Sequence, residues 1–495
     1  MALQDMPGAS MPLSDLLPEQ TVLDIAVCGL QLDSRLLLPG DAFVAIPGDV
    51  HDGRDFMAAA ASHGASVVIA ERGVSASQRR AAGQVPVVEV DGLPARLGSL
   101  ASRFFGEPAA AMHLVGITGT NGKTTTSRLL AQLLRSEFKN CGVIGTLGAT
   151  LDNSAAEAVN TTPDALGLQR QLAQWRDQSV THAVLEVSSH ALAQDRVAGL
   201  RFKTGIFTNL THDHLDYHGD MENYGLTKAR LFQLPGLEAA VINSDDPYAQ
   251  RLIEGVPDTV NVLRYSLQRA DAEILATDIR YHASGLEAQL RTPWGSGLLC
   301  SPLVGDFNLS NLMAAIAGAC LAGMSLSAVL AAAPGLQGVA GRMQAVGNEL
   351  GLQLIVDYAH TPDALAQALR ALRAHTSGEL ICVFGCGGDR DRDKRPLMGR
   401  IACEHADRVI VTSDNPRGEE PLVIIDDVVA GINGRYEVEA DRAAAIALAV
   451  RTAAPGDCVL VAGKGHETYQ QVGVERLEFS DIAQLRLALI AGGAT

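Results

Sequence analysis

The segment Gly119-Thr-Asn-Gly-Lys-Thr-Thr125 carries the residue types of a loop that binds phosphate. Gly119 and Gly122 allow backbone N–H groups to turn toward phosphate oxygens, Lys123 can reach the terminal phosphates, and Thr124 can ligate Mg²⁺. An apolar run at 113–118 precedes the loop and a helical stretch to about residue 134 follows it, as this motif requires. The alternative is a glycine-rich turn whose lysine faces solvent. The loop is a shortened GxxGKT, because Ile117 stands where the usual Walker A spacing has glycine.

A carboxylate, a histidine-rich segment and a lysine follow this loop. Glu186 lies at the end of an expected strand at 182–187, where a carboxylate beside a phosphate loop is placed to bind Mg²⁺. Taken alone, it would more often be a satisfied polar strand end. Residues 208–218 contain three histidines and two aspartates, and a solvated loop or a zinc site are the alternatives. Zinc is disfavoured, because no cysteine and no HExxH helix accompany the histidines. Lys228 taken alone would be an exposed helical lysine.

Three polar segments in the last third of the chain follow expected strands. Asp414-Asn-Pro-Arg417 is also a favourable turn sequence, and Gly463-Lys-Gly-His-Glu467 follows the last apolar run. The segment 385–394 fails as a dinucleotide fingerprint, since Arg390 occupies the third glycine position. It also fails as an EF-hand, because Lys394 occupies the glycine position of that loop.

These motifs need parallel α/β sheets to position them, and the sequence pattern predicts such sheets. Short runs rich in Val and Ile alternate with Ala/Leu-rich helical stretches. Strands are expected at 41–46, 66–70, 85–90, 113–118, 182–187, 204–208, 239–243, 354–357, 380–384, 408–412 and 458–462. Boundaries near 106–108 and 335–338 divide the chain into three α/β domains, 1–108, 109–337 and 338–495. Ligands bind at the carboxyl ends of the strands in such sheets.

Composition restricts the class of protein. A net charge of −17 argues against a nucleic-acid-binding protein, and the N-terminal residues lack the features of a signal peptide. The uncharged stretch 313–333 is mostly alanine, so we expect two short buried helices broken near Gly323 rather than a membrane span. The eight scattered cysteines are expected to be reduced core thiols. We expect a cytoplasmic monomer that neither inserts into membranes nor binds nucleic acid.

Together, the shortened GxxGKT loop, Val187-Ser-Ser-His190, the 208–218 segment and the following Lys228 closely resemble the Mur ligase superfamily. The resemblance implies an N-terminal UDP-binding domain, a central P-loop ATPase domain and a C-terminal Rossmann-like domain. It also implies that Lys228 is carbamylated and that two Mg²⁺ ions bind, one at Thr124 and Glu186 and one at His214 and the modified Lys228. The catalytic residues would be Lys123, Glu186, His214 and Lys228.

The resemblance also assigns nucleotide contacts. ATP, as co-substrate, would contact Gly119, Thr120, Asn121, Gly122, Lys123, Thr124, Thr125, Asn308, Asn311, Arg342 and Asp357. A helix N-cap at Asn308 or Ser310 is a further expectation for the segment 305–311. The UDP-linked muramoyl dipeptide would contact Leu32, Ser34, Asn160, Thr161, Thr162, Ser188, Gln194 and Arg196. Contacts of the loop Asp49-Val-His51 are left open.

The Asp-Asn-Pro-Arg tetrad is typical of the diaminopimelate-adding members of this family. It implies that Arg390 and Arg417 bind the distal carboxylate of the amino acid, and that Glu467 and the Gly463 carbonyl bind its ammonium. Asp414, Asn415 and Pro416 complete this site. The activity implied is the ATP-dependent addition of meso-diaminopimelate to a UDP-muramoyl dipeptide through an acyl phosphate. The alternatives are a lysine-adding or folylpolyglutamate-type ligase and a nucleotide-binding regulator without catalysis.

Overall fold

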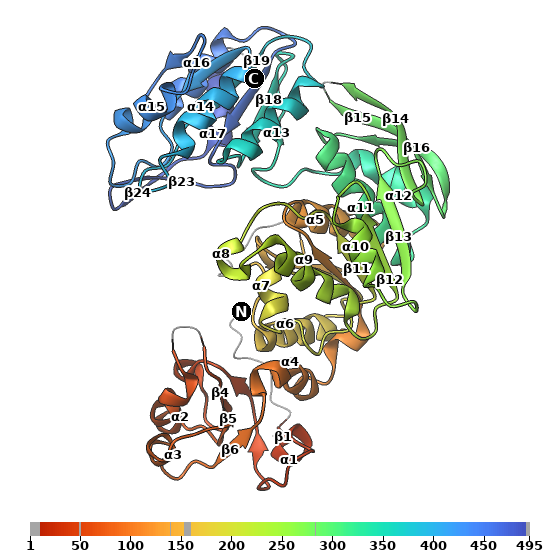
Figure 1. Cartoon of the computed structure of the whole chain (residues 1–495), viewed down its shortest axis with the longest axis vertical. Helices are drawn as coiled ribbons and strands as arrows, with labels where there is room; N and C mark the ends of the chain where they lie inside the picture. The colour runs from red at the N-terminus through yellow and green to blue at the C-terminus, as the bar shows by residue number, and fades with distance from the viewer. Residues whose placement is uncertain (1–9, 49–50, 139, 153–159, 283, 492–495) are drawn as a thin grey trace. The chain divides into compact units, whose positions relative to one another are not determined.

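The structure is a computed structural model that describes residues 10–48, 51–138, 140–152, 160–282 and 284–491 (Figure 1). Its contacts divide the chain into two compact units, Met1–Arg264 and Tyr265–Thr495, which are described separately below. The positions 108 and 337, given above as domain boundaries, stay predictions.

The N-terminal part of unit 1 contains a small parallel sheet of four strands in the order β3-β4-β5-β6. The strands are β3 (Leu30–Gln31), β4 (Ala42–Ala45), β5 (Val67–Glu71) and β6 (Val87–Val90). The helices that accompany them are α2 (Met57–Ser62), α3 (Ala76–Ala81) and α4 (Leu93–Phe104). Alternate residues of β4 and β5 enter different apolar clusters, so both faces of this sheet are buried.

A second sheet in unit 1 places the phosphate loop between two polar strand ends. Strand β7 (His113–Thr118) is hydrogen-bonded to β10 (His182–Glu186) on one side and β11 (Thr204–Phe207) on the other. The three strands are parallel, with Glu186 paired to Ile117 and Phe207 to Thr118. The loop after β7 and the residues after β10 and β11 therefore meet at one edge of the sheet.

The rest of this sheet and its helices complete the core of unit 1. Beyond β10 lie β8 (Cys141–Gly145) and the antiparallel β9 (Gly148–Thr150), and beyond β11 lies β12 (Ala239–Asn243). The helices near the loop are α5 (Lys123–Glu137), α6 (Ala165–Asp177), α7 (Ser189–Ala193), α8 (Leu215–His218) and α9 (Met221–Ala229). A large apolar cluster that includes Trp175, Phe202, Phe207 and Phe232 lies against the sheet.

Unit 2 opens with an antiparallel meander that the sequence pattern did not predict. It consists of β14 (Ile274–His282), β15 (Gly285–Thr292) and β16 (Gly295–Ser301), which pair in chain order. Two helices follow, α11 (Asp306–Leu321) and α12 (Leu326–Ala332). The expected break near Gly323 is confirmed. The expectation of two short buried helices is wrong in part, because α11 has 16 residues and only Leu326 and Val329 of α12 are buried. Among the described residues no helix combines the length and apolar character needed to cross a membrane.

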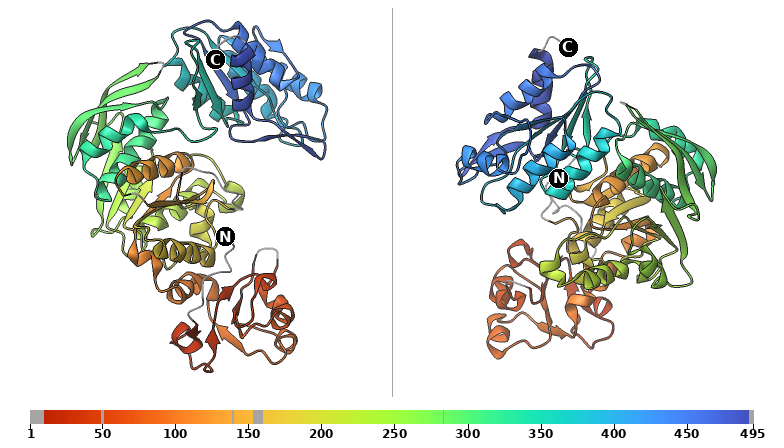
Figure 2. Two further views of the ribbon diagram at one scale, coloured as in Figure 1. Left: turned by 180° about the vertical axis from the view of Figure 1, so that it is seen from behind. Right: turned by 45° about the horizontal axis from the view of Figure 1, so that its top comes forward.

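The C-terminal part of unit 2 is a six-stranded sheet with helices on both faces (Figure 2). Its order is β17-β18-β22-β19-β20-β21, and all pairs except β17–β18 are parallel. The strands are β17 (Gln344–Val346), β18 (Gln353–Asp357), β19 (Leu380–Phe384), β20 (Arg408–Val411), β21 (Glu437–Val438) and β22 (Cys458–Ala462). The helices are α13 (Pro362–Arg373), α14 (Lys394–His405), α15 (Pro421–Val429), α16 (Arg442–Thr452) and α17 (Asp481–Ala491). A hairpin of β23 (Tyr469–Val472) and β24 (Glu475–Glu478) lies outside this sheet.

The predicted strands at 113–118, 239–243, 380–384 and 458–462 match the observed bounds, and the others differ by one or two residues at an end. The expected N-cap at Asn308 or Ser310 is wrong. Helix α11 begins at Asp306 and its N-cap is Gly305, which has no side chain to form a cap. All eight cysteines are free, and five of them are buried.

A buried ion pair joins the first residues of α16 and α17, and its removal yields a prediction about stability. Arg442 and Asp481 have side chains with no exposed surface and form two parallel hydrogen bonds of 2.7 and 2.8 Å. Asp481→Ala would leave the Arg442 guanidinium buried without its counter-ion. We expect the free energy of unfolding to fall by about 3–5 kcal/mol, measured by urea denaturation.

Asp91→Ala provides the control for this experiment. It breaks the exposed Arg72–Asp91 pair, in which both side chains are about two-thirds exposed, and should cost less than about 1 kcal/mol. Equal losses in the two variants would contradict a structural role for the buried pair.

Candidate functional site

Hydrogen bonds from the residues after β11 hold the phosphate loop in place. The Asn121 N–H donates to the Asn209 side-chain oxygen at 2.9 Å, and the Thr208 hydroxyl donates to the Asn121 carbonyl at 2.6 Å. Gly119 has φ of 151°, and a Cβ there would lie 1.9 Å from Oγ1 of Thr208. Gly122 has φ of 84° and ends the loop where α5 begins. Only glycine at 119 allows this close approach to Thr208.

Two lysines share one carbonyl of this loop. Nζ of Lys123 donates to the Gly119 and Thr120 carbonyls, and Nζ of Lys228 donates to the same Gly119 oxygen, all at 2.9 Å. Lys228, which its local sequence alone would predict to be exposed, therefore lies at the phosphate loop. Lys228 is only 1% exposed, and its Nζ lies 4.3 Å from the centre of the Tyr224 ring.

Burial lowers the pKa of Lys228 well below its usual value of 10.5. The positive charge of Lys123 lowers the pKa of Lys228 further, and Asp213 opposes the shift. The environment of Lys228 thus disfavours its charged form relative to an exposed lysine. A neutral amine can add to carbon dioxide, whereas an ammonium cannot.

Glu186 is a buried carboxylate surrounded by hydroxyl groups. It is 1% exposed, and its Oε2 accepts hydrogen bonds from the hydroxyls of Thr124 and Thr146 at 2.9 and 3.1 Å. Burial raises the pKa of this carboxyl, while Lys123 and the hydrogen bonds from Thr124 and Thr146 oppose the rise. A carboxylate beside a threonine hydroxyl is the oxygen donor set that Mg²⁺ prefers. Within the described residues no group of three or more His, Cys, Asp or Glu side chains is arranged to hold a metal.

His214 lies at the start of α8, near the tyrosine that covers Lys228. Its φ is 53°, its side chain is 48% exposed, and its Nε2 lies 3.4 Å from Oδ2 of Asp213. The ring centroids of His214 and Tyr224 are 6.3 Å apart. The structure thus brings His214 into the neighbourhood of Lys228, although its ring remains accessible to solvent.

Four residues expected to contact the muramoyl dipeptide form one network beside Glu186. The Thr162 hydroxyl donates to the Glu186 carbonyl at 2.8 Å and lies 3.3 Å from Oγ of Ser188. Arg196 donates to the Thr162 carbonyl at 2.9 Å and to the Gln194 side-chain oxygen at 2.6 Å. These hydrogen bonds fix the polar groups around the phosphate loop before any substrate binds.

The remaining residues expected to contact this substrate are less connected to the site. Thr161 is joined to it through a 3.1 Å contact with the Thr146 hydroxyl, whereas Asn160 is exposed. Leu32 and Ser34 lie in the N-terminal part of unit 1, where Ser34 begins a 3₁₀ helix and is 6% exposed. Asp49 and Val50, in the loop whose contacts were left open, lie outside the described residues.

In unit 2, the residues expected to contact ATP lie at one helix start and one strand end. Asn308 and Asn311 are buried in the first turns of α11, and the Asn308 amide donates to the Val304 carbonyl at 2.8 Å. Asp357 ends β18 and accepts from the N–H groups of Met343 and Ala359 at 2.7 and 2.8 Å. Burial raises the pKa of Asp357, and these hydrogen bonds oppose the rise. The Arg342 guanidinium lies 4.8 Å from the centre of the Tyr358 ring.

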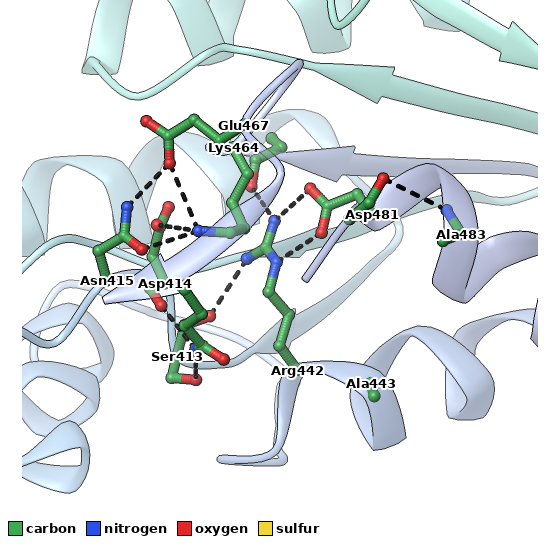
Figure 3. Close-up of polar contacts among 12 residues, drawn as sticks. Ser413, Asp414, Asn415, Arg442, Ala443, Lys464, Glu467, Asp481 and Ala483 are labelled. Carbon is green, nitrogen blue, oxygen red and sulfur yellow. Dashed lines mark hydrogen bonds and ion pairs between the residues drawn. The ribbon is translucent and has the colours of Figure 1, made fainter. Parts of the chain in front are cut away.

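The two loops expected to bind the amino acid meet at the ends of β20 and β22. Asp414, Asn415 and Glu467 surround the ammonium of Lys464 (Figure 3). Pro416 is buried next to them, and Gly463 has φ of 117°. A Cβ on Gly463 would lie 2.6 Å from Oδ2 of Asp414, so this position and its positive φ both disfavour a side chain.

The two arginines of this region lie beside Gly387. A Cβ on Gly387 would be 2.7 Å from Nη1 of Arg417 and 3.7 Å from Cγ of Arg390. Arg417 has φ of 52° and donates from Nη1 to the Gly388 carbonyl at 2.9 Å, whereas Arg390 is exposed. Two guanidinium groups next to a glycine backbone suit a carboxylate ligand.

Sequence reasoning assigned no individual role to four residues that the site depends on: Thr146, Thr208, Asn209 and Lys464. The last three lie within segments that the sequence singled out, and only Thr146 was missed altogether. Thr146 donates a hydrogen bond to Glu186, and Thr208 and Asn209 form hydrogen bonds with the phosphate loop. Lys464 lies between the loops at 414–417 and 463–467. Thr208, Asn209 and Lys464 directly follow a strand end or lie within two residues of it, so their positions were a usable signal. Thr146 belongs to a strand pair that the pattern did not predict.

The fold and these motifs define a family, and comparison with known proteins shows the same one. Family models described as "Mur ligase family, catalytic domain", "Mur ligase middle domain" and "Mur ligase, glutamate ligase domain" match residues 26–105, 117–319 and 341–465. The chain belongs to the Mur ligase family.

Relatives of high identity are similar over nearly the whole chain. The UDP-N-acetylmuramoyl-L-alanyl-D-glutamate–2,6-diaminopimelate ligase of Synechococcus elongatus is 48% identical over 491 residues, which is 97% of each chain. The ligase of the same name from Pseudomonas aeruginosa is 46% identical over 483 residues, covering 97% of this chain and 98% of the relative.

Solved structures show the same fold. The structure of a UDP-N-acetylmuramoyl-L-alanyl-D-glutamate–2,6-diaminopimelate ligase has a TM-score of 0.79 at 38% identity, over 98% of this chain and all of that one. The MurF ligase from Thermotoga maritima in complex with ADP has a TM-score of 0.61 at 20% identity, over 94% and 97%. At that lower identity, the likeness concerns the fold alone.

The lowered pKa of Lys228 yields a prediction about stability and pH. The folded state holds the Lys228 proton less tightly than the unfolded state, so this residue destabilises the fold below its usual pKa. Wild-type stability should therefore rise with pH in this range. In buffer free of carbon dioxide, Lys228→Met should be more stable than the wild type at pH 7, and the gain should shrink toward pH 10. The free energy of unfolding of both proteins is measured by urea denaturation at both pH values. Each unit of pKa shift corresponds to ~1.4 kcal/mol of this free energy.

Lys203→Met is the matched control, because Lys203 has a 43% exposed side chain paired with Glu238. Its effect on stability should change little between the two pH values. A gain for Lys228→Met that did not vary with pH would contradict the assignment of a neutral amine.

Proposed function

We propose that this protein is an ATP-dependent ligase that adds meso-2,6-diaminopimelate to UDP-N-acetylmuramoyl-L-alanyl-D-glutamate, a step of peptidoglycan precursor synthesis. The observation that carries the proposal is the juxtaposition of Asp414-Asn-Pro-Arg417 with Gly463–Glu467 beside Arg390. This arrangement offers guanidinium groups for a carboxylate and carboxylates for an ammonium. The names of the relatives that match the whole chain support the same substrate.

The first step is phosphoryl transfer from ATP to the side-chain carboxylate of the D-glutamate. The carboxylate oxygen attacks the γ-phosphorus, the bond to the β-phosphate oxygen breaks, and ADP leaves an acyl phosphate behind. The loop N–H groups and Lys123 would bind the phosphates and stabilise the charge that moves during transfer. In this structure Lys123 donates to the Gly119 and Thr120 carbonyls, which keep its ammonium at the loop.

The second step is attack on the acyl phosphate by an amine of diaminopimelate. A tetrahedral oxyanion forms and collapses to an amide and inorganic phosphate, while the amine loses a proton. The chain contributes mainly by positioning the reactants and by electrostatic stabilisation. Arg196, Thr162 and Ser188 are connected to Glu186 by hydrogen bonds and would position the dipeptide.

Two sites for Mg²⁺ belong to the proposal. Bound Mg²⁺ would neutralise phosphate charge during transfer. Thr124 and Glu186 would hold one ion, and their 2.9 Å contact supports this pairing. His214 and a carbamate on Lys228 would hold the other. The carbamate forms when the neutral Lys228 amine adds to carbon dioxide and loses a proton, which converts a buried base into a carboxylate-like anion.

The cytoplasm is the compartment we propose, and free cysteines support it because such thiols persist in reducing surroundings. The division into a UDP-substrate domain at 1–108, an ATP-binding domain at 109–337 and an amino-acid domain at 338–495 is also part of the proposal.

The direct test is phosphate release in the presence of ATP, Mg²⁺ and UDP-N-acetylmuramoyl-L-alanyl-D-glutamate with a panel of amino acids. We expect phosphate release with meso-diaminopimelate and little with L-lysine. Equal use of L-lysine would contradict the proposed substrate. An absence of phosphate release with every amino acid would instead favour a nucleotide-binding regulator.

Lys123→Ala tests the phosphate loop. Removal of this ammonium should abolish phosphate release, because the transferring phosphoryl group loses a charge that stabilises it. Circular dichroism should show that the protein remains folded. Lys203→Ala, which changes an exposed lysine of the same unit, should keep normal turnover. Near-normal turnover of Lys123→Ala would show that the loop does not bind the reacting phosphates.

Arg417→Ala tests the recognition of the distal carboxylate. Diaminopimelate differs from lysine by this one group, and sites built to hydrogen-bond a group can reject analogues that lack it by factors on the order of 10⁴. We expect the KM for diaminopimelate to rise steeply and its advantage over lysine to shrink, while the KM values for ATP and the UDP-linked substrate change little. Arg400→Ala, an exposed position on α14, is the control. An unchanged preference for diaminopimelate in Arg417→Ala would contradict the assignment.

A further inference from the structure

Lys464 has a fully buried side chain and has no role in the phosphoryl transfer or the amine attack described above. Its Nζ lies 3.4 Å from Oδ1 of Asp414 and 3.4 Å from Oε2 of Glu467, and it donates to Oδ1 of Asn415 at 2.9 Å. Figure 3 shows the ammonium among these three side chains. A cation without exposed surface needs such compensation, so the loops at 414–417 and 463–467 are held together by one charge.

The two side-chain oxygens of Glu467 have different surroundings. Oε2 accepts from Nδ2 of Asn415 at 2.8 Å and faces Nζ of Lys464. No hydrogen bond from another described residue reaches Oε1, and the side chain is 20% exposed. Lys464 and Asn415 thus fix one oxygen and leave the other accessible to a ligand.

The charges of the cluster support the same conclusion. Two carboxylates, Asp414 and Glu467, surround the one ammonium of Lys464, so one negative charge remains to be balanced. A ligand with one ammonium at this point would balance it. If the lysine were absent, two negative charges would remain and Glu467 would lose a contact that orients it.

The backbone under this cluster is fixed by a second buried cation. Arg442 donates to the Ser413 carbonyl at 3.2 Å and to the Ala462 carbonyl at 3.0 Å. These carbonyls directly precede Asp414 and Gly463. Because the strand ends are anchored in this way, the orientation of Glu467 depends on its side-chain contacts more than on movement of the loops.

We propose that Lys464 is a positioning and specificity-determining residue. It holds Oε2 of Glu467 so that Oε1 receives the ammonium at the distal end of the amino-acid substrate. This inference rests on the proposed function. It predicts that discrimination between diaminopimelate and 2-aminopimelate, which keeps both carboxylates and lacks one amine, depends on Lys464.

The test compares kcat/KM for meso-diaminopimelate and 2-aminopimelate in the wild type and in Lys464→Met, which keeps the length of the side chain without its charge. We expect the ratio of the two values to fall by about tenfold or more, because the hydrogen bond to a charged group is no longer oriented. The KM values for ATP and the UDP-linked substrate should stay within about twofold, since a structural defect would affect all substrates together. The ratio for Lys203→Met should equal that of the wild type.

A double variant separates action through Glu467 from an independent effect. Lys464→Met/Glu467→Gln removes both charges and is the variant to use if Lys464→Met does not fold. Its substrate ratio should match that of Glu467→Gln alone within about twofold, because coupled residues are not additive. A ratio more than about threefold below that of Glu467→Gln would overturn the inference.

The outcomes also distinguish this inference from the proposed function. If the wild type releases no phosphate with meso-diaminopimelate, the proposed function fails. If the wild type discriminates between the two amino acids and folded Lys464→Met keeps the same ratio, the proposed function survives and the role of Lys464 is overturned.

Discussion

The carbonyl oxygen of Gly119 accepts hydrogen bonds from the side chains of two lysines, Lys123 and Lys228, both at 2.9 Å. Two ammonium groups so close to each other repel, and one of them is almost fully buried. The repulsion is relieved when one lysine loses its charge or when anions bind between them. The lowered pKa of Lys228 is the first of these responses, and we propose phosphate binding by Lys123 as the second. The proposed phosphate binding by Lys123 and the proposed modification of Lys228 therefore both depend on the contact of these two lysines with the Gly119 carbonyl.

Unit 2 uses buried cations differently. Lys464 lies between two carboxylates, and Arg442 forms a bidentate pair with Asp481, so both positive charges are compensated within the protein. Compensated charges hold the strand ends of β20 and β22 and shape a site for a zwitterionic ligand. In unit 1, the two lysines at the phosphate loop lie close to each other, and burial lowers the pKa of Lys228. We propose that they serve a polyanion and chemical modification. Local charge balance thus differs between the site proposed to bind phosphate and the site proposed to bind an amino acid.

Much of the site was predictable because its polar residues follow apolar strands. Parallel strands bring their carboxyl ends to one edge, so Gly119, Glu186 and Thr208 had to meet once β7, β10 and β11 paired. The burial of Lys228 was not predictable from its helix alone, since it results from packing of α9 against the loop. Resemblance to the family identified this lysine where local pattern failed.

Other features depend on tertiary contacts that no local pattern contains. The β14–β16 meander alternates polar and apolar residues only in part, and β14 has a bulge between Thr277 and Arg280 that interrupts the alternation. Helix α11 begins at Asp306 after the N-cap Gly305, although Asn308 and Ser310 are the better capping residues. The Gly305 N–H donates to the buried His375 at 3.0 Å, which is a tertiary contact. The short strand β9 and its neighbour Thr146 were missed for the same reason.

Lys228 is a buried lysine with a lowered pKa, and we propose that it is available for modification by carbon dioxide. The measurement that tests this proposal most directly is ¹³C NMR of the protein equilibrated with ¹³C-labelled bicarbonate. The account predicts a carbamate resonance in the wild type and in Lys203→Met that is absent from Lys228→Met. A fully active wild-type protein without this resonance would contradict the account.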